Sequence, residues 1–262
     1  MALLNGKIVA ITGSSRGIGK AAALKCAEQG AAGMVLHYYG DEATSEEVLS
    51  LEDEITTKYR CDIVSVPGDI ADPATSTNIV TRGVEKFSRI DVLVSNAGIC
   101  PFYDFLSMPR EVWARTMAVN LDGSFYVVQG QAVANQMKSQ NPQGGSIIQI
   151  SSWSAYGGGE FQAHYGPTKA GVLSLMQSCA VALGKYGIRC NAILPGTIST
   201  EINKEDLANP EKRAYMEKRI SLGRLGNPDD VAGPIVFMAS DLARYVTGSA
   251  LLVAGGLFVN LQ

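Results

Sequence analysis

The chain has 262 residues, of which 46% are hydrophobic and 18% charged, and its formal net charge is −3. This composition fits a folded α/β enzyme with a large core and excludes a disordered chain and a membrane protein. The slightly acidic balance argues against a nucleic-acid surface, so we expect small-molecule partners, no nucleic acid and no membrane. Five scattered cysteines without a Cys-x-x-Cys pair, and no room for a signal peptide before the first strand, predict a cytoplasmic protein.

Short β-rich runs alternate with helical patterns along the whole chain. Such alternation predicts a single-domain α/β fold with a doubly wound parallel sheet and helices on both faces. No linker, repeat or low-complexity tract divides residues 1–262. The expected strands are 7–12, 34–38, 62–66, 91–95, 146–150, 189–194 and 250–253, and the expected helices are 17–29, 43–59, 73–88, 109–138, 164–185 and 228–239.

A glycine-rich turn, Thr12-Gly-Ser-Ser-Arg-Gly-Ile-Gly19, lies between the first expected strand and the first expected helix. A phosphate-binding fingerprint requires this strand–turn–helix context. Bare glycines let the backbone approach a pyrophosphate, and the helix N-terminus faces it. The turn therefore predicts a dinucleotide site.

Tyr165 and Lys169 are four residues apart, and Ser152 lies thirteen residues upstream of Tyr165. Residues four positions apart, as Tyr165 and Lys169 are, face the same side of a helix. A phenol normally loses its proton near pH 10, and a neighbouring ammonium lowers that pKa, so the phenol can act as a general acid/base on an alcohol–ketone pair. Each motif alone is weak, since Tyr-x-x-x-Lys is common on helix surfaces. Together with the glycine turn they predict hydride transfer to or from nicotinamide.

The segment 196–227 is polar and has no obvious strand. It follows the carboxyl end of a strand, where doubly wound folds bind ligands, so we expect a lid over the substrate rather than a passive loop. His37 and His164 cannot form a metal site by their spacing, and no Cys/His/carboxylate cluster stands out. We expect no metal.

With these residues in view, essentially the whole chain resembles the short-chain dehydrogenase/reductase family. The chain departs from the family pattern at two positions. Ser95 precedes Asn96 where the family has a second Asn, and Ala254 precedes Gly255-Gly256 where the family commonly has an Asp. The resemblance implies a Rossmann-like sheet of seven strands and a nicotinamide cofactor. The family motifs occur in order at Thr12-Gly13, Gly17, Gly19, Asp69, Asn96-Ala97-Gly98, Asn120, Ser152, Tyr165, Lys169, Pro195-Gly196 and Thr200.

The resemblance also implies roles for the catalytic set. Tyr165 is the acid/base, and Ser152 orients the reacting oxygen. Lys169 lowers the pKa of the phenol and holds the ribose hydroxyls of the cofactor. Asn120 interrupts its helix to hold a water linked to Lys169, which gives the proton a route to solvent.

NADP is the expected cofactor, with NAD also possible. An NAD-binding fold usually ends its second strand with an acid that grips the ribose 2′-hydroxyl, but here Asp41 comes late. Arg16, inside the glycine turn, can pair with a 2′-phosphate. The expected cofactor contacts are Gly13, Ser15, Arg16, Gly17, Ile18, Gly19, His37, Tyr38, Asp69, Ile70, Asn96, Ala97, Gly98, Tyr165, Lys169, Pro195, Gly196, Ile198 and Thr200.

The substrate expectation comes from two segments, 182–200 and 255–262, which are similar to those of fungal L-rhamnose 1-dehydrogenases. Those enzymes oxidise the C1 hydroxyl of an aldose to the lactone. Polar residues flanking the catalytic set suit a sugar, because a site built for hydroxyls rejects analogues that lack them. The alternative is that they only face solvent at a pocket rim. The candidates are Ser152, Ser154, Gln162, His164, Tyr165, Thr197 and Asn203.

Three other functions are left open: a 3-oxoacyl-thioester reductase, a general carbonyl reductase and a catalytically silent NADP-sensing protein. The sensing protein requires a broken catalytic set, and the set is intact. A carrier-protein substrate requires a basic patch, which does not stand out. For assembly we expect a homotetramer. The helices at 109–138 and 164–185 have more apolar residues than one sheet face covers, and the tail 256–259 is suited to burial against a neighbour.

Overall fold

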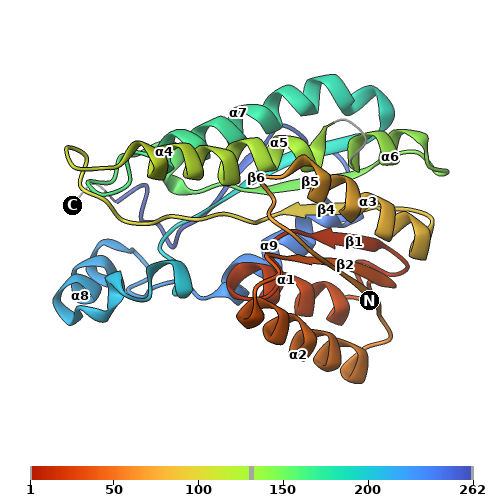
Figure 1. The fold of residues 1–262 in the computed structure, drawn as a ribbon, viewed down its shortest axis with the longest axis horizontal. Helices are drawn as coiled ribbons and strands as arrows, with labels where there is room; N and C mark the ends of the chain where they lie inside the picture. Colours follow the sequence, from red (N-terminus) through yellow and green to blue (C-terminus); the bar gives the residue numbers. More distant parts are fainter. Residues whose placement is uncertain (1, 130–132, 261–262) are drawn as a thin grey trace.

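The computed structural model describes residues 2–129 and 133–260 (Figure 1). Seven parallel strands form one sheet in the order β3-β2-β1-β4-β5-β6-β7. The sequence-based prediction of a doubly wound parallel sheet is confirmed, with a strand at each of the seven expected places. The strands are β1 (Ile8–Ile11), β2 (Gly33–Tyr38), β3 (Asp62–Pro67), β4 (Val92–Ser95), β5 (Gly145–Ile150), β6 (Ile188–Pro195) and β7 (Ala250–Val253).

Helices cover both faces of the sheet, with α1, α2 and α9 on one side and α3 to α7 on the other (Figure 1). Side chains alternate along each strand, so that Val94 packs in one core and its neighbour Leu93 in the other. In the described part of the chain, no helix has the length and apolar character needed to cross a bilayer. The helices are α1 (Gly17–Glu28), α2 (Glu42–Lys58), α3 (Pro73–Phe87), α4 (Arg110–Met117), α5 (Gly123–Val128), α6 (Val133–Ser139), α7 (Tyr165–Leu183), α8 (Pro210–Arg219) and α9 (Pro228–Ala239).

The prediction of one continuous helix over 109–138 is wrong. The structure has three helices there, and a π-helical turn at Ala118–Asp122 joins α4 to α5. The side chain of Asn120, within this turn, bonds to the backbone of Ile99, and a π turn accommodates one extra residue per turn at such sites. Residues 130–132 of the predicted helix lie outside the described residues.

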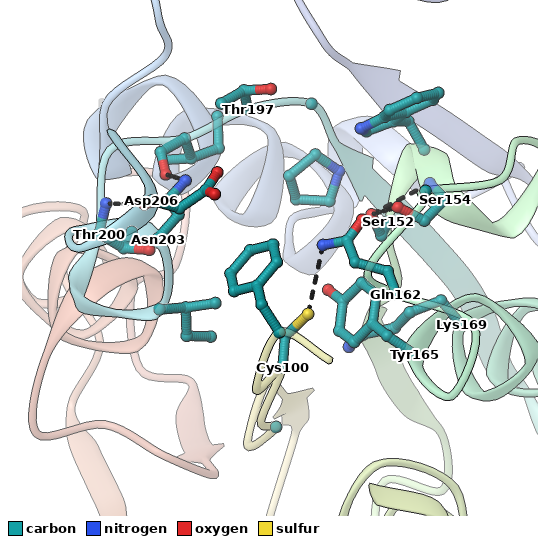
Figure 2. A pocket seen from close by; sticks show the side chains of 18 of the residues that line it. Cys100, Ser152, Ser154, Gln162, Tyr165, Lys169, Thr197, Thr200, Asn203 and Asp206 are labelled. Atoms are coloured by element: carbon teal, nitrogen blue, oxygen red, sulfur yellow. Dashed lines mark hydrogen bonds between the residues drawn. The ribbon is translucent and has the colours of Figure 1, made fainter. Parts of the chain in front are cut away.

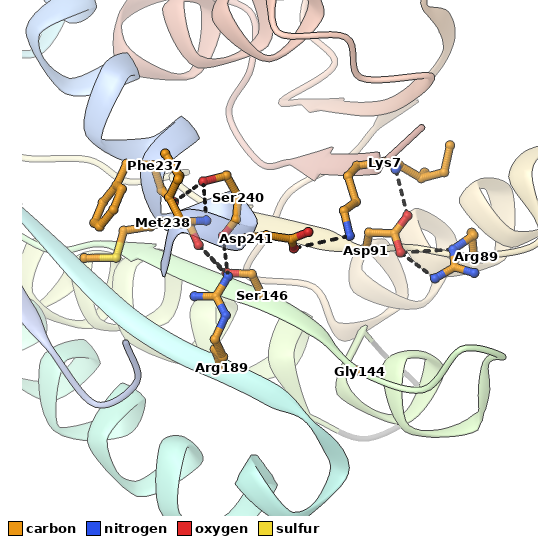
Figure 3. Close-up of polar contacts among 12 residues, drawn as sticks. Lys7, Arg89, Asp91, Gly144, Ser146, Arg189, Phe237, Met238, Ser240 and Asp241 are labelled. Atoms are coloured by element: carbon orange, nitrogen blue, oxygen red, sulfur yellow. Dashed lines mark hydrogen bonds and ion pairs between the residues drawn. The ribbon is translucent and has the colours of Figure 1, made fainter. Parts of the chain in front are cut away.

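Charged side chains connect neighbouring elements at the amino-terminal ends of the strands (Figure 3). One Asp91 oxygen accepts from the Ile8 N–H at 2.9 Å, and the other accepts from Arg89 at 2.6 and 3.0 Å. Arg189 donates to the carbonyls of Met238 (2.8 Å) and Ser240 (3.3 Å) at the end of α9. These bonds connect β1, β4, β6 and α9 at the edge opposite the glycine turn.

The segment 196–227 is not a bare loop, because it contains α8 and two single-turn 3₁₀ helices. Leu257, close to the end of the described chain, packs in a small core with Leu207, Ile220 and Leu225. The Asn260 amide donates to the Arg219 carbonyl at 2.9 Å. Within the tail, Leu257 thus packs on the 196–227 segment of its own chain, whereas Phe258 and Val259 stay exposed, and burial of the tail against a neighbouring subunit stays a prediction.

Candidate active site

The carboxyl ends of β1 and β4 meet at the glycine turn. The Thr12 hydroxyl accepts from the backbone N–H groups of Asn96 (2.9 Å) and Ala97 (3.0 Å). The Asn96 amide donates to the carbonyls of Thr12 (3.0 Å) and Gly13 (2.9 Å). A Cβ on Gly13 would lie 2.9 Å from Ala97 Cα, and a Cβ on Gly19 would collide with the Gly13 carbonyl. Both positions therefore require glycine for this close approach.

The glycine turn leads into the N-terminus of α1. Gly17 has φ of +55°, a left-handed conformation that side chains disfavour. Arg16 is the N-cap residue, and its side chain makes no capping hydrogen bond. The first N–H groups of a helix lack intrahelical partners and attract an anion together with the helix dipole. The bare backbone and the free helix end fit the pyrophosphate of a dinucleotide.

His37, at the end of β2, has a buried ring, and both of its nitrogens bond to backbone groups. Nδ1 accepts from the Gly13 N–H at 3.2 Å, and Nε2 donates to the Gly68 carbonyl at 2.9 Å. Burial lowers the pKa of His37 to about 4, so the imidazole is neutral at physiological pH. The ring, expected to contact the cofactor, is instead committed to holding the glycine turn beside β3.

Acid is therefore expected to destabilise the fold through His37. Its pKa is lower in the folded chain than in the unfolded one, so the unfolded chain binds the proton first. The associated stability is complete above about pH 6.5 and is lost toward about pH 4, with a limit of about 3 kcal/mol. Urea unfolding at about pH 7.5 and about pH 4.5 measures this loss. His37→Asn should lose much less free energy between these two pH values; an equal loss in both proteins would contradict the assignment.

Asp69 and Ile70 follow β3. One carboxylate oxygen of Asp69 accepts from the Ala71 N–H at 3.0 Å, and the other pairs with Arg115 at 2.6 Å. Ile70 is buried, and its carbonyl lies where a Cβ on Gly123 would come within 2.8 Å. Asp69 thus remains partly open to solvent, whereas Ile70 packs against α5.

The three expected catalytic residues lie together where β5 ends and α7 begins. Ser152 follows β5, Tyr165 is the first residue of α7, and Lys169 lies one helical turn later. The Lys169 ammonium donates to the Ile150 carbonyl at 2.9 Å and lies 5.4 Å from the centre of the Tyr165 ring. The Ser152 hydroxyl accepts from the Ser154 N–H at 3.1 Å, which fixes its position.

The pKa of Tyr165 differs from the sequence expectation. Burial raises the pKa of this phenol, and the hydroxyl of Ser152 only partly opposes the effect. Burial also lowers the pKa of Lys169 to about 8. Desolvation of the site therefore dominates the pKa of the phenol, and the predicted lowering by Lys169, whose ammonium is buried and bonded to the Ile150 carbonyl, does not appear.

Asn120 is fully buried in the π-helical turn. Its carbonyl oxygen accepts from the Ile99 N–H at 2.8 Å, and its amide donates to the Ile99 carbonyl at 2.9 Å and to Thr168 at 3.2 Å. A Cβ on Gly98 would lie 3.2 Å from the Asn120 oxygen and 3.5 Å from the Lys169 nitrogen. Asn120 and Lys169 thus converge on the bare backbone of Gly98.

A cavity of about 420 Å³ lies above the catalytic residues, between the carboxyl ends of the strands and the 196–227 segment (Figure 2). Ser152, Tyr165 and Lys169 lie on one side, while Thr200, Asn203 and Asp206 lie on the other. Across the described ranges, no three His, Cys, Asp or Glu side chains gather to hold a metal ion. The cavity brings together the predicted residues Ile18, Asn96, Gly98, Ser152, Ser154, Gln162, Tyr165, Lys169, Pro195, Gly196, Thr197, Ile198, Thr200 and Asn203.

Of the predicted substrate residues, His164 is placed differently from the expectation, and Asn203 lies at the cavity with its amide bonded within its own segment. His164 does not line the cavity and is fully buried, because consecutive helical residues do not share a face and Tyr165 takes the inner position. Asn203 lines the cavity, but its oxygen accepts from the Thr200 N–H at 3.0 Å and its amide donates to the Ile198 carbonyl at 2.8 Å. It therefore shapes the start of the lid segment.

Several lining residues were missing from the predicted site. Cys100 accepts a hydrogen bond from the Gln162 amide at 3.3 Å, and an ion pair joins Asp206 to Lys212. Lys212 also lies 5.8 Å above the Phe102 ring. No motif marks the residues of the 196–227 segment, which reach the site only through the fold of that segment, whereas Cys100 and Phe102 follow β4 and Trp153 follows β5. The additional lining residues include Cys100, Phe102, Trp153, Asp206, Leu207, Lys212, Met216 and Arg219.

Comparison with known proteins agrees with this geometry. A family model described as Enoyl-(Acyl carrier protein) reductase matches residues 13–258. An L-rhamnose 1-dehydrogenase (NAD(P)(+)) of Azotobacter vinelandii is 58% identical over 260 residues, 99% of this chain and 100% of that protein. An L-rhamnose-1-dehydrogenase of Scheffersomyces stipitis is 56% identical over 260 residues, 99% of each chain. A crystal structure of a gluconate 5-dehydrogenase from Burkholderia cenocepacia in complex with NADP and tartrate has a TM-score of 0.89 at 32% identity, covering 98% of this chain and 96% of that one. The chain therefore belongs to the short-chain dehydrogenase/reductase family.

Proposed function

We propose that this protein oxidises the C1 hydroxyl of an aldose, L-rhamnose above all, to the lactone with NADP or NAD. The observation that carries the proposal is the convergence of Ser152, Tyr165 and Lys169 on a cavity beside the glycine turn that is lined by polar as well as apolar side chains. Relatives that are 58% and 56% identical over nearly the whole chain carry that activity in their names. Gln162, Thr197 and the Asp206–Lys212 pair line the same cavity and suit a ligand with several hydroxyls.

The residues present fit a nicotinamide dinucleotide. The glycine turn and the N-terminus of α1 suit the pyrophosphate, and Asp69 and Ile70 border the adenosine side. Asn96, Gly98 and the 195–200 segment continue this path to the catalytic residues. The chemistry that a bound nicotinamide supplies is acceptance of a hydride from C1 of the sugar.

The chain's own residues handle the proton. Because burial raises the pKa of Tyr165, the phenol must first lose its own proton. The resulting phenolate removes the proton of the C1 hydroxyl while the C1–H bond breaks, and a carbon–oxygen double bond forms at C1. Ser152 donates a hydrogen bond to the same oxygen and orients it. A protonated Lys169 stabilises the phenolate, and its pKa of about 8 means that it can itself exchange a proton near the working pH. Asn120, converging with Lys169 on Gly98, is positioned to hold a water that passes this proton on.

A substrate screen tests the function. L-rhamnose, L-lyxose, L-mannose, D-glucose and D-galactose are offered with NADP or NAD at mildly alkaline pH, and acetoacetyl thioesters and simple ketones are offered with NADPH. We expect lactone from L-rhamnose. Reduction of the thioester or the ketones without oxidation of any aldose would favour an acyl or general carbonyl reductase.

Arg16→Ala is expected to weaken NADP binding by about ten- to hundredfold and to leave NAD binding nearly unchanged. The reason is that a guanidinium–phosphate contact is a charge-assisted hydrogen bond, and NAD lacks that phosphate. Dissociation constants for both nucleotides, measured by calorimetry, check this. Equal NADP affinity in the variant and the parent would show that Arg16 does not bind the 2′-phosphate.

We also propose that the 196–227 segment closes over the substrate and that the protein forms a homotetramer. Val181 on α7, Trp113 on α4 and Phe125 on α5 are exposed, which supports burial of this face in an assembly. All five cysteines are free thiols, which supports a reducing compartment, the cytoplasm.

Light scattering at micromolar concentration is expected to give the mass of four chains. The apolar faces of α4, α5 and α7 supply the association energy, so Val181→Glu should shift the mass toward smaller species. A monomer mass for the parent protein would contradict the tetramer.

A further inference from the structure

The predicted phosphate-binding arginine already has a carboxylate partner within the chain. Arg16 precedes α1, and Glu47 lies in the second turn of α2. The Arg16 Nε atom is 3.4 Å from the Glu47 Oε2 atom, with 47% and 34% of the two side chains exposed. Glu47 therefore lies beside the position that Arg16 offers to a 2′-phosphate.

This ion pair is loosely made. The Glu47 Oε2 atom is buried, yet it receives no hydrogen bond from any residue in the described ranges. A buried oxygen without a hydrogen bond is unfavourable, and a partly exposed ion pair contributes little to offset that cost. The pair is thus poised to open when a stronger anion approaches Arg16.

The other nearby carboxylate is committed elsewhere. The Asp41 carboxylate also interacts electrostatically with Arg16, but its Oδ1 atom caps α2 by accepting from the Thr44 N–H at 2.8 Å. Glu46, the neighbour of Glu47, is exposed and forms no ion pair within the described chain. Glu47 is therefore the carboxylate that is free to follow Arg16.

We propose that Glu47 sets the balance between NADP and NAD by competing with the 2′-phosphate for Arg16. This inference rests on the proposed use of a nicotinamide dinucleotide. A phosphate monoester carries nearly two negative charges and three acceptor oxygens, so it displaces Glu47 from the guanidinium. Opening the Arg16–Glu47 pair costs part of the free energy gained from the phosphate, which weakens NADP binding. With NAD the Arg16–Glu47 pair stays closed, and the nucleotide meets no uncompensated charge.

The experiment is a double-mutant cycle read by nucleotide binding without sugar. Dissociation constants for NADP and NAD are measured calorimetrically for the parent, Glu47→Gln, Arg16→Ala and the double variant. Glu47→Gln should tighten NADP binding by about three- to fivefold, the size of one partly exposed charge contact, with NAD unchanged. The gain should vanish in the Arg16→Ala background and shrink at high salt.

Glu46→Gln is the matched control, because it removes the same charge one residue away and should change neither constant. Glu47→Ala provides a second variant if the amide makes a new hydrogen bond. Equal effects of Glu46→Gln and Glu47→Gln, or a gain that persists without Arg16, would overturn the proposal. Binding of both nucleotides without oxidation of any aldose would sink the proposed substrate and leave the Glu47 test valid, whereas binding of neither nucleotide would overturn both.

Discussion

Replacing Tyr165 by phenylalanine is expected to lower kcat for L-rhamnose oxidation by about 10²- to 10⁴-fold, the range of general acid–base catalysis. The hydroxyl carries the proton, while the ring, buried at the start of α7, packs as before. Nucleotide dissociation constants should therefore stay close to those of the parent. Steady-state kinetics and calorimetry on the same preparation measure the two effects separately.

Tyr245→Phe is the control for this substitution, because Tyr245 is fully exposed and remote from the cavity. Tyr245→Phe should keep the kcat and the nucleotide dissociation constants of the parent. Turnover by Tyr165→Phe within tenfold of the parent would assign the proton transfer to another group, and Ser152 would be the next candidate.

Lys169→Met is expected to impair both turnover and nucleotide binding, since in the proposed mechanism the ammonium acts on the Tyr165 phenol and on the ribose of the nucleotide. A loss of kcat/KM of about 10³-fold fits one group with both roles. The substitution should also change how the free energy of unfolding depends on pH. The pKa of Lys169 falls from 10.5 to about 8 on folding, so the unfolded chain binds the proton more tightly. The contribution of Lys169 to stability therefore rises with pH between about 8 and 10.5, while the buried cysteine thiols, whose pKa values burial raises, act in the opposite direction. Lys169→Met should differ from the parent by the loss of this one contribution.

Urea unfolding at about pH 7.5 and about pH 10 tests the stability arm of this prediction. Lys185→Met makes the same substitution at an exposed position and should leave activity and pH dependence intact. The assignment fails if Lys169→Met keeps the parent's nucleotide affinity, or if its free energy of unfolding changes between these two pH values as the parent's does.

The sheet was predictable because its signal is local. The inner strands β1 and β4 are short apolar runs buried on both faces, so burial and sequence pattern coincide there. The break in the helix after β4 was not predictable, because its cause is a bond from Asn120 to Ile99, a residue 21 positions away. Only the family resemblance pointed to an interruption there.

Helix α8 shows a different limit of the sequence. Its residues are charged and none is buried, so it has no apolar period to detect. The Asn209-Pro210 pair was an available signal, because Asn caps the helix and Pro suits its first position. The residues that line the cavity from this segment depend on where α8 docks, which no local pattern encodes.

The Tyr165 environment shows why electrostatics was harder to predict than placement. The spacing of Tyr165 and Lys169 correctly brought the two side chains together on α7. Their pKa values depend on how deeply the whole site is buried and on the Ile150 carbonyl that holds the ammonium. Neither quantity is a property of the four-residue motif.

The charged side chains that connect the amino-terminal ends of the strands have a consequence for how such enzymes diverge. Arg89, Asp91 and Arg189 fix that edge, and none of them lines the catalytic cavity. Selection on substrate choice can therefore act on the loops of the opposite edge while the anchor of the scaffold stays intact. A gluconate 5-dehydrogenase with 32% identity and a TM-score of 0.89 fits this separation. New specificities can arise here by loop substitution on an inherited frame, without a new fold having to evolve.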